Sequence, residues 1–193
     1  MLEKDIIYVY IFSTSDIDLE YDIPSFLFDK ISRYKDINKR NIKLTKYNRL
    51  LKEIKKFGVD TSSFKIVNGK PHIDGLYIST SDSKLYYGFS FSLNNHGIDI
   101  EEELEGKKYN NLEKYLSNIK YDNDMDAVLK WTFEEAYSKY LGTGITKESL
   151  EEKKNIDDFY WVKKDKSYIT VYKKNCLLQL RFIMTKGDLI CQD

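Results

Sequence analysis

The order of its apolar segments is the feature of this sequence that most constrains its fold. Short runs rich in β-branched and aromatic residues, typical of strands, alternate with runs whose apolar residues recur at helical spacing. Strands are predicted at residues 5–13, 76–81, 85–93, 96–101, 158–163, 167–173 and 177–184. Helices are predicted at residues 25–34, 43–57, 109–119 and 124–141. This mixture of strands and helices predicts an α+β fold.

The helix at 43–57 has the clearest pattern in the first half of the chain. Its apolar residues follow the i, i+3, i+4, i+7 spacing: Tyr47, Leu50, Leu51 and Ile54. Its opposite side is basic and carries Lys46, Arg49, Lys52 and Lys56. Gly58 is a stop signal. Residues 67–75, VNGKPHIDG, are predicted as a turn-rich stretch.

The predicted elements run strand, helices, three strands, helices and three strands. This order resembles one α+β unit written twice, with the join near Asn94 and Asn95. We therefore expect two halves, residues 1–94 and 95–193. Because both halves lie in one chain, a monomer is expected.

Composition excludes several classes of protein. The formal net charge is zero, which argues against a dedicated nucleic-acid binder, and no run approaches the roughly 18 apolar residues of a membrane helix. With two histidines and with Cys176 and Cys191 in no metal-type spacing, neither a zinc site nor a disulfide framework is expected. A reducing cytoplasm is the simplest location.

Charge is unevenly distributed along the sequence. Residues 30–56 contain eleven Lys and Arg against two acids, and residues 99–126 contain nine acids against four lysines. Two solvated faces would account for this pattern. So would a basic half and an acidic half that together bind an anion with the help of a cation, such as a pyrophosphate.

Three acids are candidate metal ligands. Asp99 and Glu101 are two apart on a predicted strand, so they share a face while Ile98 and Ile100 point into the core. Gly97 would allow another backbone or a ligand to approach closely. Carboxylates on one face suit Mg²⁺, although an exposed pair on a strand edge would have the same spacing.

Glu135 and Lys139 share a face of the helix at 124–141. An i,i+4 pair of this kind is also common on solvated helix surfaces, where it stabilises the helix by only about 0.2–0.5 kcal/mol. Spacing alone therefore gives neither pair of residues a function.

Together, these segments resemble a known family. The strand GIDIE (97–101) and the helix WTFEEAYSK (131–139) resemble the two signature motifs of Sfp-type 4′-phosphopantetheinyl transferases. GTGI (142–145), NGKP (68–71) and STS (79–81) resemble that family's G-x-G-L/I loop, its G-K-P element and its S-H-S element. The resemblance covers roughly residues 5–160.

The resemblance implies a pair of similar α+β halves related by a pseudo-twofold axis, with coenzyme A as substrate in the cleft between them. It implies that Asp99, Glu101 and Glu135 hold Mg²⁺ and that Lys139 contacts the pyrophosphate. The further coenzyme A contacts that it implies are Arg49, Gly69, Lys70, Pro71, Ser79, Thr80 and Ser81. The reaction would move phosphopantetheine onto a serine of an apo carrier protein, with Glu135 favoured over Glu101 as the base.

Two residues depart from the family pattern. Thr80 stands where histidine is usual, which predicts weaker coenzyme A binding. Glu134 stands where lysine is common, and its side chain is expected either to face solvent or to repel the pyrophosphate. These departures leave an alternative, a non-catalytic relative that binds coenzyme A or a carrier without turnover. Trp131 is expected in the core, and His96 is expected to be structural or partly exposed.

Overall fold

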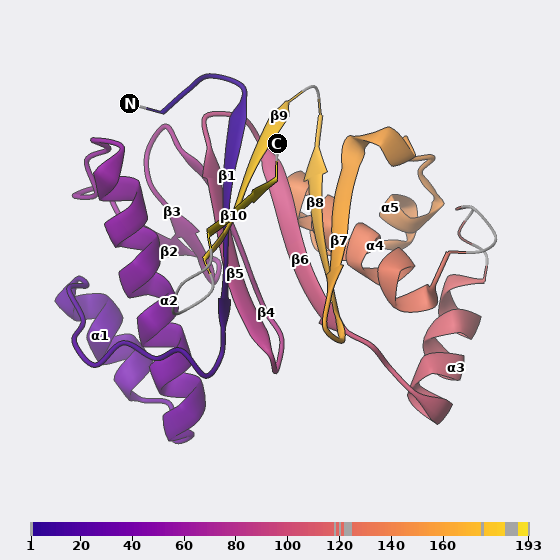
Figure 1. Ribbon diagram of the computed structural model, residues 1–193, viewed down its shortest axis with the longest axis horizontal. Helices are drawn as coiled ribbons and strands as arrows, with labels where there is room; N and C mark the ends of the chain where they lie inside the picture. The colour runs from indigo at the N-terminus through magenta and orange to yellow at the C-terminus, as the bar shows by residue number, and fades with distance from the viewer. Residues whose placement is uncertain are drawn as a thin grey trace.

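The computed structural model describes residues 2–117, 119, 121, 125–174, 176–183 and 189–192, which form a mixed α+β structure (Figure 1). The strands are β1 (Ile6–Ser13), β2 (Lys65–Val67), β3 (Lys70–His72), β4 (Tyr77–Asp82), β5 (Tyr86–Ser92), β6 (His96–Glu102), β7 (Phe159–Lys164), β8 (Ser167–Lys173), β9 (Leu177–Ile183) and β10 (Leu189–Gln192). The helices are α1 (Ser25–Ser32), α2 (Ile37–Lys56), α3 (Gly106–Leu116), α4 (Ala127–Leu141), α5 (Lys147–Glu151) and the 3-10 turn η1 (Ile156–Asp158).

Two larger sheets each contain three strands arranged in the same order. The first sheet runs β10-β9-β1-β5-β4, and the second runs β6-β8-β7. Within β1-β5-β4 and within β6-β8-β7, the earliest strand lies beside the latest one, and all these neighbours are antiparallel. β9 pairs in parallel with β1, so a late segment of the chain completes the first sheet.

Four layers follow from the burial of these elements. Figure 1 shows α1 and α2 on one side of the sheets and α3, α4 and α5 on the other. β1 is buried on both faces: Tyr8, Tyr10 and Phe12 pack with α1 and α2, while Ile7, Val9 and Ile11 pack with residues of β6 and β8. A third cluster lies between α4 and the second sheet. All three core clusters are apolar, and their burial holds the helices against the sheets and the two sheets against each other.

Most predicted elements are confirmed with small shifts of their ends, and two differences are larger. α2 begins at Ile37 rather than at 43, because the Asp36 side chain accepts a hydrogen bond from the Lys39 N–H and caps the helix. The turn-rich stretch contains the hairpin β2–β3, closed by Asn68 and Gly69 at φ 50° and 79°. Asn-Gly with two positive φ angles is the type I′ hairpin turn. α5, η1 and β10 were not predicted.

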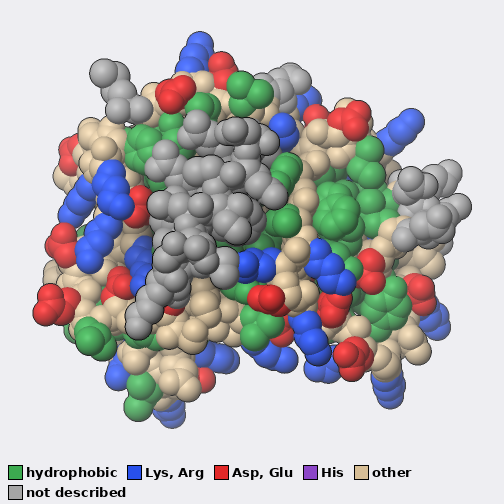
Figure 2. Space-filling model, viewed as in Figure 1, with side chains coloured by type: hydrophobic (Ala, Val, Ile, Leu, Met, Phe, Trp, Pro, Cys, Tyr) green, Lys and Arg blue, Asp and Glu red, His purple; other side chains and the backbone are tan. Residues whose placement is uncertain are grey.

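Charges of both signs are interspersed over the face shown in Figure 2, outside its grey atoms. On that face, neither the basic nor the acidic side chains form one continuous patch. In the part of the chain that the structure describes, no helix has the length and apolar character needed to cross a membrane.

Candidate functional site

β6 presents its acids and its isoleucines to opposite sides, as predicted. Ile98 and Ile100 are buried in the core between the two sheets. Asp99 is only 3% exposed and Glu101 is half-buried. Since β6 is an edge strand of its sheet, its two carboxylates lie where neighbouring elements from both halves of the chain can reach them.

Gly97 brings α4 into direct backbone contact with β6. A Cβ atom at this position would collide with the Ala136 carbonyl oxygen and would lie 2.9 Å from the Tyr140 nitrogen. The predicted close approach is therefore confirmed, and the approaching backbone is that of α4. This contact places Lys139 of α4 with its Nζ atom 2.6 Å from Asp99 Oδ1.

Asp99 has one satisfied oxygen and one that is not. Oδ1 accepts hydrogen bonds from the Lys139 ammonium and, at 2.9 Å, from the Ser81 hydroxyl. Oδ2 is buried and has no hydrogen-bond partner within the described structure. Leaving a buried acceptor unpaired is costly, by about 1–3 kcal/mol. A carboxylate oxygen of this kind is suited to a hard cation.

The Asp99 carboxylate acts electrostatically on the other two acids. Burial, followed by the negative charges of Asp99 and Glu135, raises the pKa of Glu101 to about 7, while a hydrogen bond from Trp131 opposes the rise. Burial and the charge of Asp99 also raise the pKa of Glu135. Each acid therefore favours a neighbouring positive charge.

Mg²⁺ fits this site by donor chemistry. In proteins, Mg²⁺ is usually bound by one or two carboxylates together with phosphate and water. Asp99 Oδ2 has no hydrogen-bond partner among the described residues and is an oxygen that could coordinate the ion. Within the described residues, however, no three His, Cys, Asp or Glu side chains converge closely enough to enclose an ion as they lie. Asp99 is thus near enough to Glu101 and Glu135 to raise the pKa values of both, but the three acids do not form a closed ligand cage.

Two of the three STS residues join the sheets. The Ser79 and Ser81 hydroxyls accept hydrogen bonds from the N–H groups of Ile98 and Ile100, both at 3.1 Å, so β4 is fastened to the free edge of β6. The predicted contact of these serines with phosphate would therefore have to form while both hydroxyls keep their hydrogen bonds to β6. Thr80 lies between them, half-buried, and lines a small cavity of about 60 Å³.

A larger groove of about 810 Å³ opens beside these residues. Its walls come from the β2–β3 hairpin, from β4 and from the end of α4 with the loop that follows. Three predicted segments meet there, since Lys70 and Pro71, Lys139, and the stretch 142–144 all line it. Gly69 occupies the hairpin turn and is not one of the lining residues.

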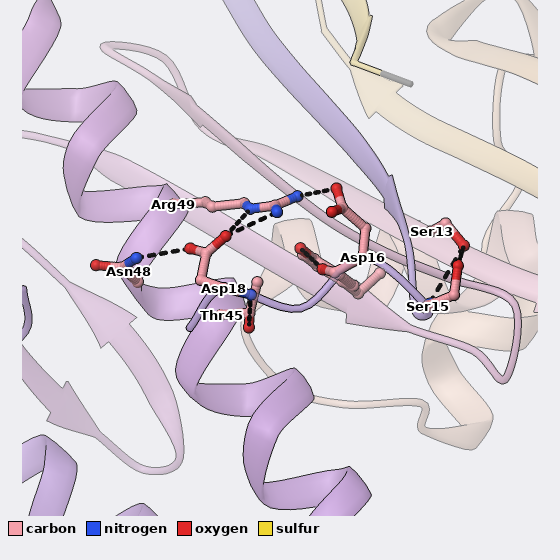
Figure 3. Close-up of polar contacts among 8 residues, drawn as sticks. Ser13, Ser15, Asp16, Asp18, Thr45, Asn48 and Arg49 are labelled. Carbon is pink, nitrogen blue, oxygen red and sulfur yellow. Dashed lines mark hydrogen bonds and ion pairs between the residues drawn. The ribbon is translucent and has the colours of Figure 1, made fainter. Parts of the chain in front are cut away.

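Arg49 lies elsewhere. Its guanidinium group donates to Asp16 at 2.5 Å and to Asp18 at 2.7 and 2.9 Å, as Figure 3 shows. It also lies 4.6 Å from the centre of the Phe12 ring, and Asn48 donates to the same Asp18 side chain. Arg49 lines neither cavity described above. These contacts of Arg49 hold the segment after β1 against α2.

Lys46 was missed as a candidate because the helical pattern placed it only on the basic side of its helix. It is 4% exposed, and its Nζ atom lies 2.6 Å from Asp82 Oδ1. Burial lowers the pKa of Lys46, Asp82 opposes this, and the positive charges of Lys43 and Lys139 add to the lowering. Lys46 therefore belongs to the same charged region as Lys139, although no sequence motif indicated it.

Glu134 does not face solvent, so that expectation was wrong, while the expected repulsion of a pyrophosphate stays a prediction. It is buried, accepts a hydrogen bond from the Tyr121 hydroxyl at 2.7 Å and forms an ion pair with Lys154. Burial raises the pKa of Glu134, and both partners oppose the rise. Trp131, expected in the core, is half-buried and packs edge-on against Tyr115.

Comparison with protein-family models yields no match for this chain, and comparison with curated proteins yields none either.

Proposed function

We propose that this protein is a Mg²⁺-dependent 4′-phosphopantetheinyl transferase acting on an apo acyl or peptidyl carrier protein. The observation that carries the proposal is the position of Lys139. Its ammonium group is bound to the buried Asp99 carboxylate, and the same side chain lines the groove that holds Lys70, Pro71 and the 142–144 loop. One lysine thus connects a candidate cation site to a candidate nucleotide site.

For the fold, we infer two α+β halves related by a pseudo-twofold axis. The shared strand order of β1-β5-β4 and β6-β8-β7 supports this inference, as does the helix that each sheet carries on its outer side. A ligand between such halves would contact β4 and the hairpin from one half and β6 and α4 from the other. The groove has that composition, and its volume is in the range of about 300–1,000 Å³ usual for ligand sites.

We propose that coenzyme A lies in this groove, with Lys70 and Pro71 against the adenine and Lys139 at the pyrophosphate. Thr80, which lines the adjoining cavity, is proposed to donate its hydroxyl to a phosphate oxygen. Arg49 is left out of the proposed contacts because Asp16 and Asp18 already neutralise it. Ser79 and Ser81 are assigned to positioning β6 and Asp99.

The proposed reaction is a phosphoryl transfer. The serine hydroxyl of the carrier forms a new oxygen–phosphorus bond, and adenosine 3′,5′-bisphosphate leaves as the pyrophosphate linkage breaks. Asp99, Glu101 and Glu135 would hold Mg²⁺, which neutralises negative charge on the pyrophosphate when it is bound. Lys139 orients the pyrophosphate. Glu135 accepts the serine proton, a role that a carboxyl with a raised pKa performs well near neutral pH.

The test incubates the protein with an apo carrier, coenzyme A and Mg²⁺, and follows the intact mass of the carrier. The carrier is expected to gain one phosphopantetheine group, and chelation of the metal should stop the gain. We expect Asp99→Asn to lower the transfer rate by about 10²–10³-fold, the usual effect of removing one electrostatic contact to a transition state. Glu105→Gln, at an exposed acid of the same stretch, is the matched control.

Coenzyme A binding, measured separately by calorimetry, distinguishes the alternatives. Binding without transfer to several carriers would favour a non-catalytic relative. If the wild-type protein binds no coenzyme A, both forms of the proposal fail.

A further inference from the structure

Glu134 and Lys154 form a buried ion pair outside the proposed catalytic set. Their side chains are 0% and 2% exposed, and the Lys154 ammonium lies 2.9 Å from one Glu134 carboxylate oxygen and 3.0 Å from the other. Glu134 belongs to α4, whereas Lys154 follows α5. The pair therefore joins α4 to the segment after α5, which the chain reaches through the loop that follows α4.

Lys154 also binds the backbone of α5 and of the residue that follows it. Its ammonium group donates to the carbonyl oxygens of Ser149 at 2.6 Å and Glu152 at 3.3 Å. It lies 5.0 Å from the centre of the Tyr137 ring, one turn along α4 from Glu134. A single buried cation thus holds the end of α5 against two residues of α4.

The segment held in this way includes one wall of the groove. α4 ends at Leu141, and Gly142 follows with a φ of 77°, the left-handed conformation of a helix stop. Thr143 and Gly144 then line the groove, and Thr146 begins α5 by a reciprocal capping interaction with Ser149. The groove wall is therefore a short loop fixed at one end by α4 and at the other by Lys154 through α5.

We propose that Lys154 and Glu134 are positioning residues that hold the 142–144 wall in place and thereby set the affinity of the groove for its nucleotide ligand, without contacting that ligand. The identity of the ligand rests on the proposed function. A buried ion pair is weak support for stability, since apolar residues of similar size often serve as well or better. The pair instead fixes the position of the 142–144 loop before a ligand binds. If the loop had to become ordered during binding, the entropy lost would lower the affinity for the ligand.

The test uses the double variant Glu134→Gln/Lys154→Met, which leaves no unpaired buried charge and retains an acceptor for Tyr121. Lys153→Met is the matched control, because it makes the same substitution at the exposed neighbouring position. Hydrogen exchange of the amides in 143–152, read by mass spectrometry, reports the anchoring without any ligand. Coenzyme A affinity and, for transfer, KM and kcat report the consequence.

In the double variant, we expect amide exchange in 143–152 at least about tenfold faster than in the wild type, while β1 and β8 stay protected. Coenzyme A affinity should fall about tenfold, equivalent to about 1.4 kcal/mol, with KM raised and kcat within about twofold. A loss of folded protein would instead lower the apparent kcat and leave KM unchanged. Lys153→Met should match the wild type in every measurement.

Unchanged exchange in 143–152 would overturn the proposal, and so would faster exchange with unchanged coenzyme A affinity. If the wild-type protein binds no coenzyme A, the proposed function fails, and the exchange data still decide whether Lys154 anchors the segment.

Discussion

His96 begins β6 three residues before Asp99, and it is kept neutral by burial. Its Nε2 atom lies 2.8 Å from Ser90 Oγ and its Nδ1 atom 2.9 Å from the Asn94 carbonyl oxygen. A neutral ring satisfies both contacts, with Nδ1–H donating to the carbonyl and Nε2 accepting from the hydroxyl. Burial lowers the pKa of His96 from 6.5 to about 4, and the two hydrogen bonds only partly oppose it.

We therefore expect His96 to make stability depend on pH between about 4 and 6.5. In that range the unfolded chain binds a proton on this side chain and the folded chain does not, so the free energy of unfolding falls as the pH falls. From pH 7.5 to pH 5 the loss due to His96 should be about 2 kcal/mol, at about 1.4 kcal/mol per pKa unit. Urea unfolding of wild type and His96→Gln at both pH values measures it.

The difference between the two proteins isolates His96, because the acids with raised pKa values change stability in the opposite direction over part of the same range. An identical pH dependence in wild type and His96→Gln would contradict the assignment.

The ion-pair partners of single residues could not be predicted where those partners are distant in the sequence. The alternation of Asp99 with Ile98 and Ile100 was predictable, because strand geometry decides it locally. Arg49 is paired with residues 31 and 33 positions away, and Lys46 with one 36 positions away. No local periodicity encodes such choices, so both side chains were taken as part of a basic helix side.

At the scale of elements, the contact between β6 and α4 determines the site. Gly97 has no side chain, so the two backbones meet, and Lys139 reaches Asp99 from the next turn of the helix. The sequence predicted both elements and the close approach at Gly97. It did not predict the hairpin β2–β3, because strands of three residues are too short to show alternation.

Gly97→Ala is expected to force β6 and α4 apart. The added methyl group would overlap backbone atoms, which cannot rotate away as a side chain would, so we expect a loss of about 3 kcal/mol in the free energy of unfolding. Transfer activity of the remaining folded protein should fall as well. Urea unfolding midpoints and the carrier mass assay give the two readings.

Gly58→Ala is the control, because a Cβ there meets no atom within 4 Å and only its φ of 76° resists the change. Its cost should be about 1–2 kcal/mol, with transfer activity kept. A Gly97→Ala protein as stable and active as the wild type would show that the backbones do not touch.

At the scale of the whole molecule, the two halves share an apolar core between their sheets, in addition to the cluster that each has beneath its own helices. Ile7, Val9 and Ile11 of the first half pack with isoleucines of β6 and with residues of β8 in the second. β9 then adds a strand from the second half to the sheet of the first. The order of elements predicted most of the strands and helices, but it could not predict that β9 joins the first sheet, because the sequence of an apolar strand does not specify which strand it pairs with.

We expect residues 1–94 alone to lack a folded structure, since one face of β1 and the edge later covered by β9 would be exposed. Residues 95–193 alone should likewise fail to fold. Mixing the two fragments should restore cooperative thermal unfolding and a single peak in size-exclusion chromatography at the mass of the full chain. Cooperative unfolding of either fragment by itself would contradict the shared core.

The pairing of β1 with β9 also has a consequence during synthesis. The two strands are in register from Ile6 and Leu177 onwards, so a ribosome makes about 170 residues between them. At about 5–20 residues per second, the emerging first strand keeps one edge open for on the order of ten seconds or more. During that interval a nascent chain is a substrate for chaperones that shield such edges, and a stalled ribosome would release a product that proteases can recognise.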